Sequence, residues 1–178
     1  FTVIGETYIS PFNIYSNKIK DVSELKDGDK FLIPNDPTNG GRALIVMEQA
    51  GIITIDPAKN DPANGVYPAE EDITANPKNI EIVPSDRNII MNSLDDAAAG
   101  IANANAVVDF GKSVDDDSIF KLDPDPKLDV NKPWINVIVA RTEDKDSETY
   151  KKIVAAYHQD NVRDLMNNES KGAEIPTW

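Results

Sequence analysis

The chain has 178 residues, 40% of them apolar, which is enough for one globular domain or two small ones. Lysine and arginine number 18 against 31 aspartates and glutamates, and the formal net charge is −13. Such a charge repels phosphate backbones, so nucleic acid is not expected as a partner. The acidic surface either keeps the protein dispersed or attracts a cationic partner, and the first explanation is the simpler one.

The sequence contains no cysteine, which excludes disulfides, thiolate metal sites and cysteine nucleophiles. No apolar run approaches the roughly 18 residues that a membrane span needs, and Phe1 opens directly into a strand-like segment. We therefore expect that any export signal or lipid anchor was removed or never included.

Short β-branched runs alternate with helical patterns, which predicts an α/β fold with parallel strands. Residues 1–4 and 8–9 are expected to be extended, and residues 31–33 to form a buried strand. Ser23 is the predicted N-cap of a short helix over residues 24–26.

The best-defined helix is predicted over residues 43–50, with Thr38 or Asn39 as its N-cap and Gly51 as its end. Residues 56–68 contain three prolines and a glycine and are expected to form a surface loop.

Further along, the sequence predicts a half-exposed strand over residues 79–83 and a short helix start at residues 93–96, before the alanine-rich residues 97–102. A strand is expected over residues 137–140. Ser147 should cap a helix that runs through Tyr157, and a shorter helix should follow over residues 162–166.

An acidic connector, residues 115–117 and 123–126, raises the question of a calcium site. An EF-hand loop needs a glycine at its sharp turn and a distal glutamate, and neither has the right spacing here. No metal is therefore expected.

The strongest local pattern for ligand binding is the turn over residues 33–42, which leads from a strand into a helix. Gly40 and Gly41 would let a ligand approach the backbone, and the helix N-terminus favours an anion. Arg42 could hold a carboxylate with two parallel hydrogen bonds. The alternative, a surface arginine beside an ordinary capped helix, stays open on spacing alone.

Asn103 and Asn136 lie at predicted strand ends, where open α/β sheets bind ligands. An asparagine side chain can accept from an ammonium group and donate to a carboxylate, which suits a zwitterion. Asparagine is also common in turns, and for each residue alone that is the simpler explanation.

Nothing in the sequence marks an enzyme. His158 is the only histidine and lies in a helix of packing and solvated positions, and there is no nucleophile elbow or dinucleotide-binding loop. No two carboxylates stand out as an acid and base pair.

Taken together, these residues resemble the methionine-binding lipoproteins of ABC importers, the NlpA family. The turn Asn-Asp-Pro-Thr-Asn followed by Gly-Arg is the most diagnostic part. The matching stretches are residues 14–20, 24–28, 34–42, 76–79, 93–96, 136–139 and 171–173.

The resemblance implies a type II periplasmic-binding-protein fold, of which the chain holds one complete lobe and part of the second. Residues 1–14 and 135–178 would belong to the partial lobe and residues 15–134 to the complete one. By the same resemblance Arg42 holds the ligand carboxylate and Asn103 grips the amino acid backbone. Asn136, Asn39 and Tyr15 are the other expected ligand-binding residues.

The implied function is an extracytoplasmic receptor, lipid-anchored as a precursor, that captures methionine or a closely related amino acid or small peptide. It would deliver this ligand to a permease and ATPase, with no cofactor and no catalysis. The alternative is a surface interaction module derived from this family that has lost transport.

The chain departs from the family pattern in two respects that bear on the site. The family's N-terminal section, which supplies aromatic walls for the methionine side chain, is missing before Phe1, and Ala106 stands where a tyrosine is usual. A partial lobe would leave apolar sheet surface bare, so we expect self-association or a fragment that has lost its N-terminal piece.

Overall fold

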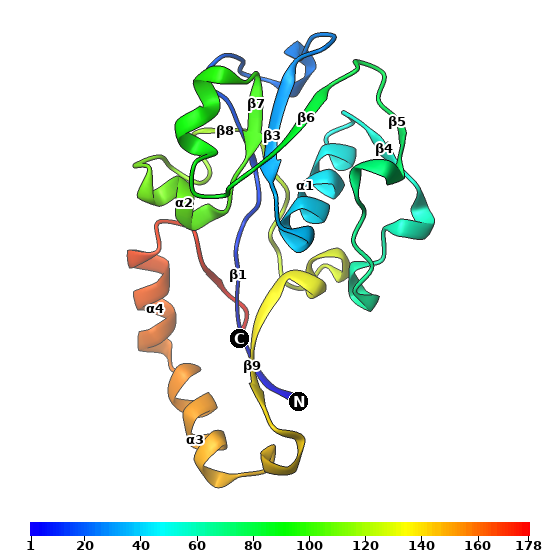
Figure 1. The fold of residues 1–178 in the computed structure, drawn as a ribbon. Helices are drawn as coiled ribbons and strands as arrows, with labels where there is room; N and C mark the ends of the chain where they lie inside the picture. Colours follow the sequence, from blue (N-terminus) through cyan, green and yellow to red (C-terminus); the bar gives the residue numbers. More distant parts are fainter. The chain divides into compact units, whose positions relative to one another are not determined.

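The computed structural model describes residues 1–178 and divides into two compact units. Unit 1 comprises residues 1–11 and 123–178, and unit 2 comprises residues 12–122 (Figure 1). Residues 123–134, which the sequence analysis placed in the complete lobe, fall in unit 1. No helix combines the length and apolar character that crossing a membrane requires.

Unit 2 is built on a five-stranded sheet of order β6-β3-β7-β2-β8. Its strands are β2 (Ile14–Tyr15), β3 (Lys30–Pro34), β6 (Glu81–Ser85), β7 (Ala99–Ile101) and β8 (Ser118–Phe120). β3 runs parallel to β6 and β7, whereas β2 is antiparallel to β7 and β8. The predicted parallel strands are therefore confirmed at the centre of the sheet and wrong at one side.

Central position explains the composition of β3. Its residues from Phe31 to Pro34 are all buried, and strands covered on both faces consist of unbroken apolar runs. The alanine-rich stretch becomes β7, where Gly100 faces the neighbouring strand closely: a Cβ there would lie 3.1 Å from the Cβ of Leu32. Small residues thus let β7 pack against β3.

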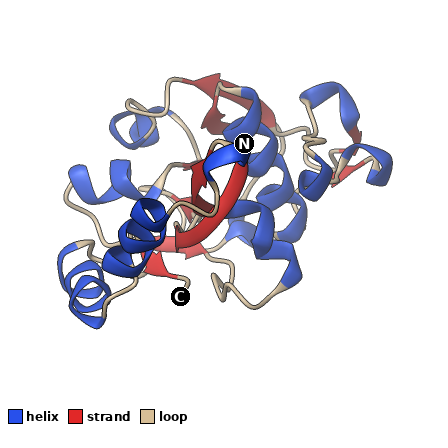
Figure 2. Cartoon of the chain, turned by 90° about the horizontal axis from the view of Figure 1, so that it is seen from below, coloured by secondary structure: helices blue, strands red, loops and turns tan.

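The remaining elements of unit 2 are short apart from helix α1 (Pro37–Gln49). Strands β4 (Thr54–Ile55) and β5 (Ile73–Ala75) form a separate antiparallel pair, and α2 (Ala104–Asp109) follows β7. There are also 3-10 helices at Val22–Glu24, Pro57–Lys59, Pro62–Asn64, Glu70–Asp72 and Met91–Asp96. Figure 2 shows the whole chain with helices in blue, strands in red and loops in tan.

Two predicted N-caps are wrong, and in both cases an aspartate just upstream is the cap. Asp21, not Ser23, caps the first short helix, and its carboxylate accepts from the Ser23 N–H at 2.8 Å. Asp36 caps α1 because a residue before proline is held extended, which suits an N-cap better than a helical position. Gly51 ends α1 in the left-handed region, as predicted, with φ of 71°.

Unit 1 contains an antiparallel sheet of order β10-β1-β9. Its elements are β1 (Thr2–Ile9), β9 (Ile135–Ala140), α3 (Glu148–Tyr157), α4 (Asp160–Glu169), β10 (Ile175–Pro176) and 3-10 helices at Asp129–Trp134 and Thr142–Asp144. The predicted cap Ser147 stands at the start of α3. His158 stacks on Trp178 with ring centroids 5.0 Å apart and lies 2.7 Å from the Glu6 carbonyl oxygen, so it belongs to a packing cluster.

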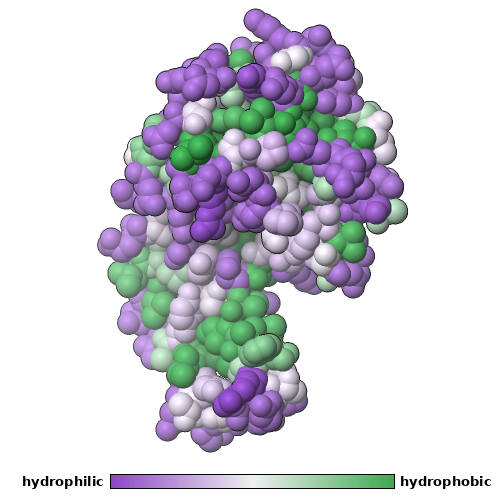
Figure 3. All heavy atoms as spheres, viewed as in Figure 1, coloured by the Kyte–Doolittle hydropathy of each residue, from purple (hydrophilic) through white to green (hydrophobic).

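Valines on β1 and β9 are exposed in unit 1. Val3 pairs with Val139, and they are 56% and 53% exposed, with Val137 at 41%. Figure 3 shows hydrophobic residues, in green, gathered low on this face, where β9 lies in Figure 1. Self-association through such a surface stays a prediction.

Gly41 allows a close approach between α1 and the segment that follows β4. A Cβ at Gly41 would lie 2.8 Å from the Cβ of Tyr67 and 2.9 Å from the Pro68 carbonyl oxygen. The helix and the loop can therefore touch only because position 41 has no side chain.

Gly41→Ala is expected to lower the melting temperature. The Cβ would lie under 3.0 Å from the Pro68 carbonyl oxygen, so the loop backbone must shift. This puts the cost at the upper end of the roughly 1–3 kcal/mol typical of overpacking, above the gain of about 1 kcal/mol in helix propensity. Thermal unfolding followed by circular dichroism measures this, with Thr38→Ala in the exposed first turn as the matched control. A higher melting temperature for Gly41→Ala would contradict the close packing.

Tyr15 lies at the centre of the unit 2 core with no exposed surface. Its hydroxyl donates to the Val114 carbonyl oxygen at 2.9 Å, and the Asn13 side-chain amide donates to the same oxygen at 3.0 Å. Burial raises the pKa of Tyr15, so the hydroxyl keeps its proton and its donor role. The side chain ties β2 to the segment before β8.

Tyr15→Phe is expected to lower the free energy of unfolding by about 1 kcal/mol, because a buried hydrogen bond is lost while the ring remains. Urea denaturation measures the change. An unchanged midpoint would show that Asn13 alone satisfies the Val114 carbonyl.

Candidate ligand-binding site

Two helices begin side by side at one edge of the unit 2 sheet. β3 leads through Asn35 and Asp36 into α1, and β7 leads through Ala102 and Asn103 into α2. Because β3 and β7 are parallel neighbours, their carboxyl ends meet at the same edge. This is where open α/β sheets bind ligands.

A chain of hydrogen bonds joins the two helix starts. The Asn39 backbone N–H donates to Asp36 Oδ1 at 2.9 Å, and the Asn39 side-chain amide donates to both Asp36 oxygens at 3.1 and 3.0 Å. Asn103 Nδ2 in turn donates to Asn39 Oδ1 at 3.2 Å. The structure thus brings Asn39 and Asn103, two of the predicted site residues, into contact.

Asn103 keeps one polar atom without a protein partner. Its Oδ1 is buried and accepts no hydrogen bond, and its side chain does not cap α2. A buried acceptor left unpaired costs about 1–3 kcal/mol, so a donor at this position would be stabilising.

Arg42 follows Asn39 by one turn of α1 and therefore lies on a neighbouring part of the helix surface. Its guanidinium carbon lies 4.7 Å from the centroid of the Phe12 ring. Burial lowers the pKa of Arg42 to about 10, which still leaves it protonated at neutral pH. A half-buried cation on an aromatic face is a suitable partner for a carboxylate.

The helix N-terminus itself is a poorer anion site than the sequence suggested. The Asp36 carboxylate holds the Asn39 N–H, and the Asp36 carbonyl oxygen accepts from the Gly40 N–H at 2.8 Å. An aspartate that already occupies this position adds negative charge there, so the guanidinium is the group that suits a carboxylate.

Two predicted residues lie elsewhere. Tyr15 is enclosed in the core and bonded to Val114, so its side chain offers no surface to a ligand in this structure. Asn136 belongs to unit 1, where its exposed side-chain amide donates to the Tyr8 carbonyl oxygen at 3.3 Å.

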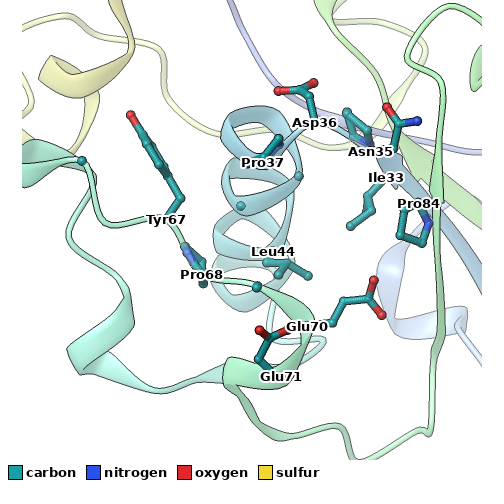
Figure 4. A pocket seen from close by; sticks show the side chains of 15 residues that line it. Ile33, Asn35, Asp36, Pro37, Leu44, Tyr67, Pro68, Glu70, Glu71 and Pro84 are labelled. Atoms are coloured by element: carbon teal, nitrogen blue, oxygen red, sulfur yellow. The ribbon is translucent and has the colours of Figure 1, made fainter.

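A groove of about 370 Å³ lies beside α1 in unit 2, and one wall of it is the turn over residues 33–42 that the sequence singled out for ligand binding. Figure 4 shows Tyr67 and Pro68 on one side of it and Ile33 and Pro84 on the other, with Glu70 and Glu71 near its rim. Neither Arg42 nor Asn103 lines it, and Asp36 does. The sequence did not indicate the other wall, which includes Tyr67 and Pro68, because the close packing of these residues on Gly41 depends on the tertiary fold.

No cluster of three or more histidine, aspartate or glutamate side chains is arranged to hold a metal ion. In the acidic connector the carboxylates bond locally: Asp117 accepts from the Ser113 N–H at 2.7 Å and Asp116 from the Ser113 hydroxyl at 3.1 Å.

Known relatives match nearly all of the chain. The D-methionine-binding lipoprotein MetQ of Salmonella typhimurium is 37% identical over 177 residues, which cover 98% of this chain and 61% of the relative. Outer membrane lipoprotein 3 of Mannheimia haemolytica is 37% identical over 175 residues, 98% of this chain and 62% of the relative. The chain therefore spans about three fifths of the length of these curated relatives.

Solved structures agree in fold. A nutrient binding protein from Burkholderia cenocepacia bound to methionine superposes with a TM-score of 0.86 at 30% identity, over 99% of this chain and 70% of that one. The methionine binding protein MetQ gives 0.80 at 35% identity, over 99% and 69% of the two chains. The mixed α/β fold is thus that of these binding proteins.

The family model for NlpA lipoproteins matches residues 1–178, which is the whole chain. The two curated relatives are each 37% identical to it, and the two solved structures, at 30% and 35% identity, have the same mixed α/β fold. The chain belongs to the NlpA lipoprotein family, a family of substrate-binding proteins and not of enzymes.

Proposed function

We propose that this chain is the ligand-capturing part of an extracytoplasmic lipoprotein that binds methionine, or a closely related amino acid, for an ABC importer. Arg42 holds the α-carboxylate, and Asn103 accepts a hydrogen bond from the α-ammonium group. The single observation that carries this proposal is the buried Asn103 Oδ1 without a partner. Asn103 is hydrogen-bonded to Asn39, and Asn39 precedes Arg42 by one turn of α1.

The charges of the two groups support a zwitterionic ligand. A guanidinium with a pKa of about 10 is cationic at neutral pH, and an amide oxygen is an acceptor for an ammonium group. No cofactor is needed for binding of this kind, and no catalytic group takes part.

Relatives support the identity of the ligand and partner. One solved relative carries methionine, and another is described as the substrate binding protein of a methionine transporter from Streptococcus pneumoniae. By this likeness the ligand is delivered to a membrane permease with its ATPase, and the protein is anchored by lipid outside the cytoplasm.

The type II periplasmic-binding-protein assignment belongs to the same proposal. Unit 2, with its five-stranded sheet, corresponds to a complete lobe, and unit 1, with three strands, to part of the other. Asn39 acts within the site through its contacts with Asp36 and Asn103.

Arg42→Lys is expected to weaken binding of L-methionine by about 10- to 150-fold, the equivalent of one charge-assisted hydrogen bond, because an ammonium group cannot reproduce the guanidinium fork. Isothermal titration calorimetry measures the affinity. Tyr15→Phe is the matched control, since that side chain is enclosed in the core of the same unit and should leave the affinity unchanged.

An Arg42→Lys protein that binds methionine as tightly as the original would reject this role for the guanidinium. A melting temperature that no free amino acid raises would favour the alternative of an interaction module, because a ligand bound only by the folded state must stabilise it.

Asn136→Ala tests the remaining predicted contact. If Asn136 binds the ligand, the affinity for methionine falls by about tenfold while the melting temperature of the ligand-free protein changes little, since its amide bond to Tyr8 is exposed. Unchanged affinity in the same titration would remove Asn136 from the site.

A further inference from the structure

We infer that Asp36 is a positioning residue that acts through Asn39 to fix which end of the Asn103 amide faces the ligand. The consequence is a site that selects ligands with a hydrogen-bond donor at the α position, as in an α-amino acid, and discriminates against 2-oxo acids. The selectivity rests on the proposed function, whereas the amide orientation can be tested without any ligand.

The direction of the hydrogen-bonded chain starts at Asp36. A carboxylate only accepts, and both of its oxygens lie within 3.1 Å of the Asn39 side-chain nitrogen. Asn39 must therefore turn its NH2 group toward Asp36 and its carbonyl oxygen the other way. An amide whose orientation is ambiguous by shape is thus set by charge.

The same logic passes to the next amide. Asn39 Oδ1 is an acceptor, so Asn103 turns its NH2 group toward it, at 3.2 Å. Asn103 Oδ1 is then left as the free end of the chain, buried and with no partner. The orientations of the Asn39 and Asn103 side-chain amides are thus both set by the Asp36 carboxylate.

The backbone holds this carboxylate in place. Asp36 also accepts from the Asn39 N–H at 2.9 Å as the N-cap of α1, and Pro37 at the first helical position keeps the preceding residue extended. One side chain thus starts the helix and orients the amides, so any substitution must preserve the cap to separate the two roles.

The Asn103 Oδ1 acceptor favours an α-amino acid over a 2-oxo acid. An α-ammonium group donates to it and adds charge, which is the stronger kind of hydrogen bond. The carbonyl oxygen of a 2-oxo acid can only accept, so it would face another acceptor. If the amide were reversed, the order of preference would change in favour of the 2-oxo acid.

The test is Asp36→Asn, which keeps the shape and the N-cap, since asparagine caps as well as aspartate. The new amide uses its oxygen for the Asn39 N–H and places a donor against the Asn39 NH2 group, which favours reversal of both amides. The affinity for L-methionine is expected to fall about tenfold. The affinity for the 2-oxo analogue of methionine should not fall with it, so the ratio of the two affinities, methionine over 2-oxo analogue, should fall by more than about tenfold.

Asp21→Asn is the matched control, because Asp21 is also an N-cap aspartate in unit 2, exposed and bonded to Ser23. It should change neither affinity. An equal loss of affinity for methionine and its 2-oxo analogue in Asp36→Asn would overturn the inference, since it would mean that Asp36 only supports the helix. No loss for either ligand would overturn it as well.

A second variant guards against misfolding of the first. Asn39→Ala removes the link between Asp36 and Asn103 and favours the helix. It should lower the same affinity ratio, and adding Asp36→Asn to it should have no further effect on that ratio, because the coupling is already gone. Additive effects of the two changes on the ratio would contradict a shared path.

Nuclear magnetic resonance of the ligand-free protein separates this inference from the proposed function. The Asn103 side-chain NH2 signals should show contacts to the Asn39 side chain in the original protein and lose them in Asp36→Asn. If methionine does not bind the original protein, the proposed function fails, yet these contacts still decide the orientation. Their absence from the original protein would overturn the inference.

Discussion

Parallel pairing of β3 with β7 is the constraint on which the candidate site depends. It aligns Phe31 with Ala99 and Leu32 with Gly100, and so brings the carboxyl ends of both strands to one edge. Both strands turn into helices there, and residues 64 positions apart in the chain come within hydrogen-bonding distance. The small residues of β7 make this pairing possible, because a side chain at Gly100 would press on Leu32.

The candidate site contains one cation, Arg42, and one anion, Asp36, in a strongly acidic protein. Arg42 is one of 18 basic residues and is held against Phe12, where burial lowers its pKa without removing its charge. Asp36 lies at the start of the same helix, and its carboxylate accepts hydrogen bonds from the backbone N–H and the side-chain amide of Asn39. The Arg42 guanidinium is thus the group suited to a ligand carboxylate, while the Asp36 carboxylate orients the side-chain amides of Asn39 and, through it, Asn103.

Family membership and side-chain geometry answer different questions about this molecule. Likeness over nearly the whole chain establishes the family and the fold. It does not say how the Asn39 and Asn103 amides are oriented, or that Tyr15 lies in the core. Those points follow from donors, acceptors and burial within unit 2.

The sequence by itself determined what depends on neighbouring residues. The apolar run of β3, the end of α1 at Gly51, the start of α3 at Ser147 and the family pattern around Arg42 were all readable, because each follows from contiguous residues. The N-caps Asp21 and Asp36 were missed, although for Asp36 the following Pro37 was a local signal. Tertiary structure alone decided the antiparallel side of the sheet, the burial of Tyr15 and the Asp36–Asn39–Asn103 chain. These depend on contacts between distant segments, and side-chain spacing along the chain carries no information about which strand lies beside which.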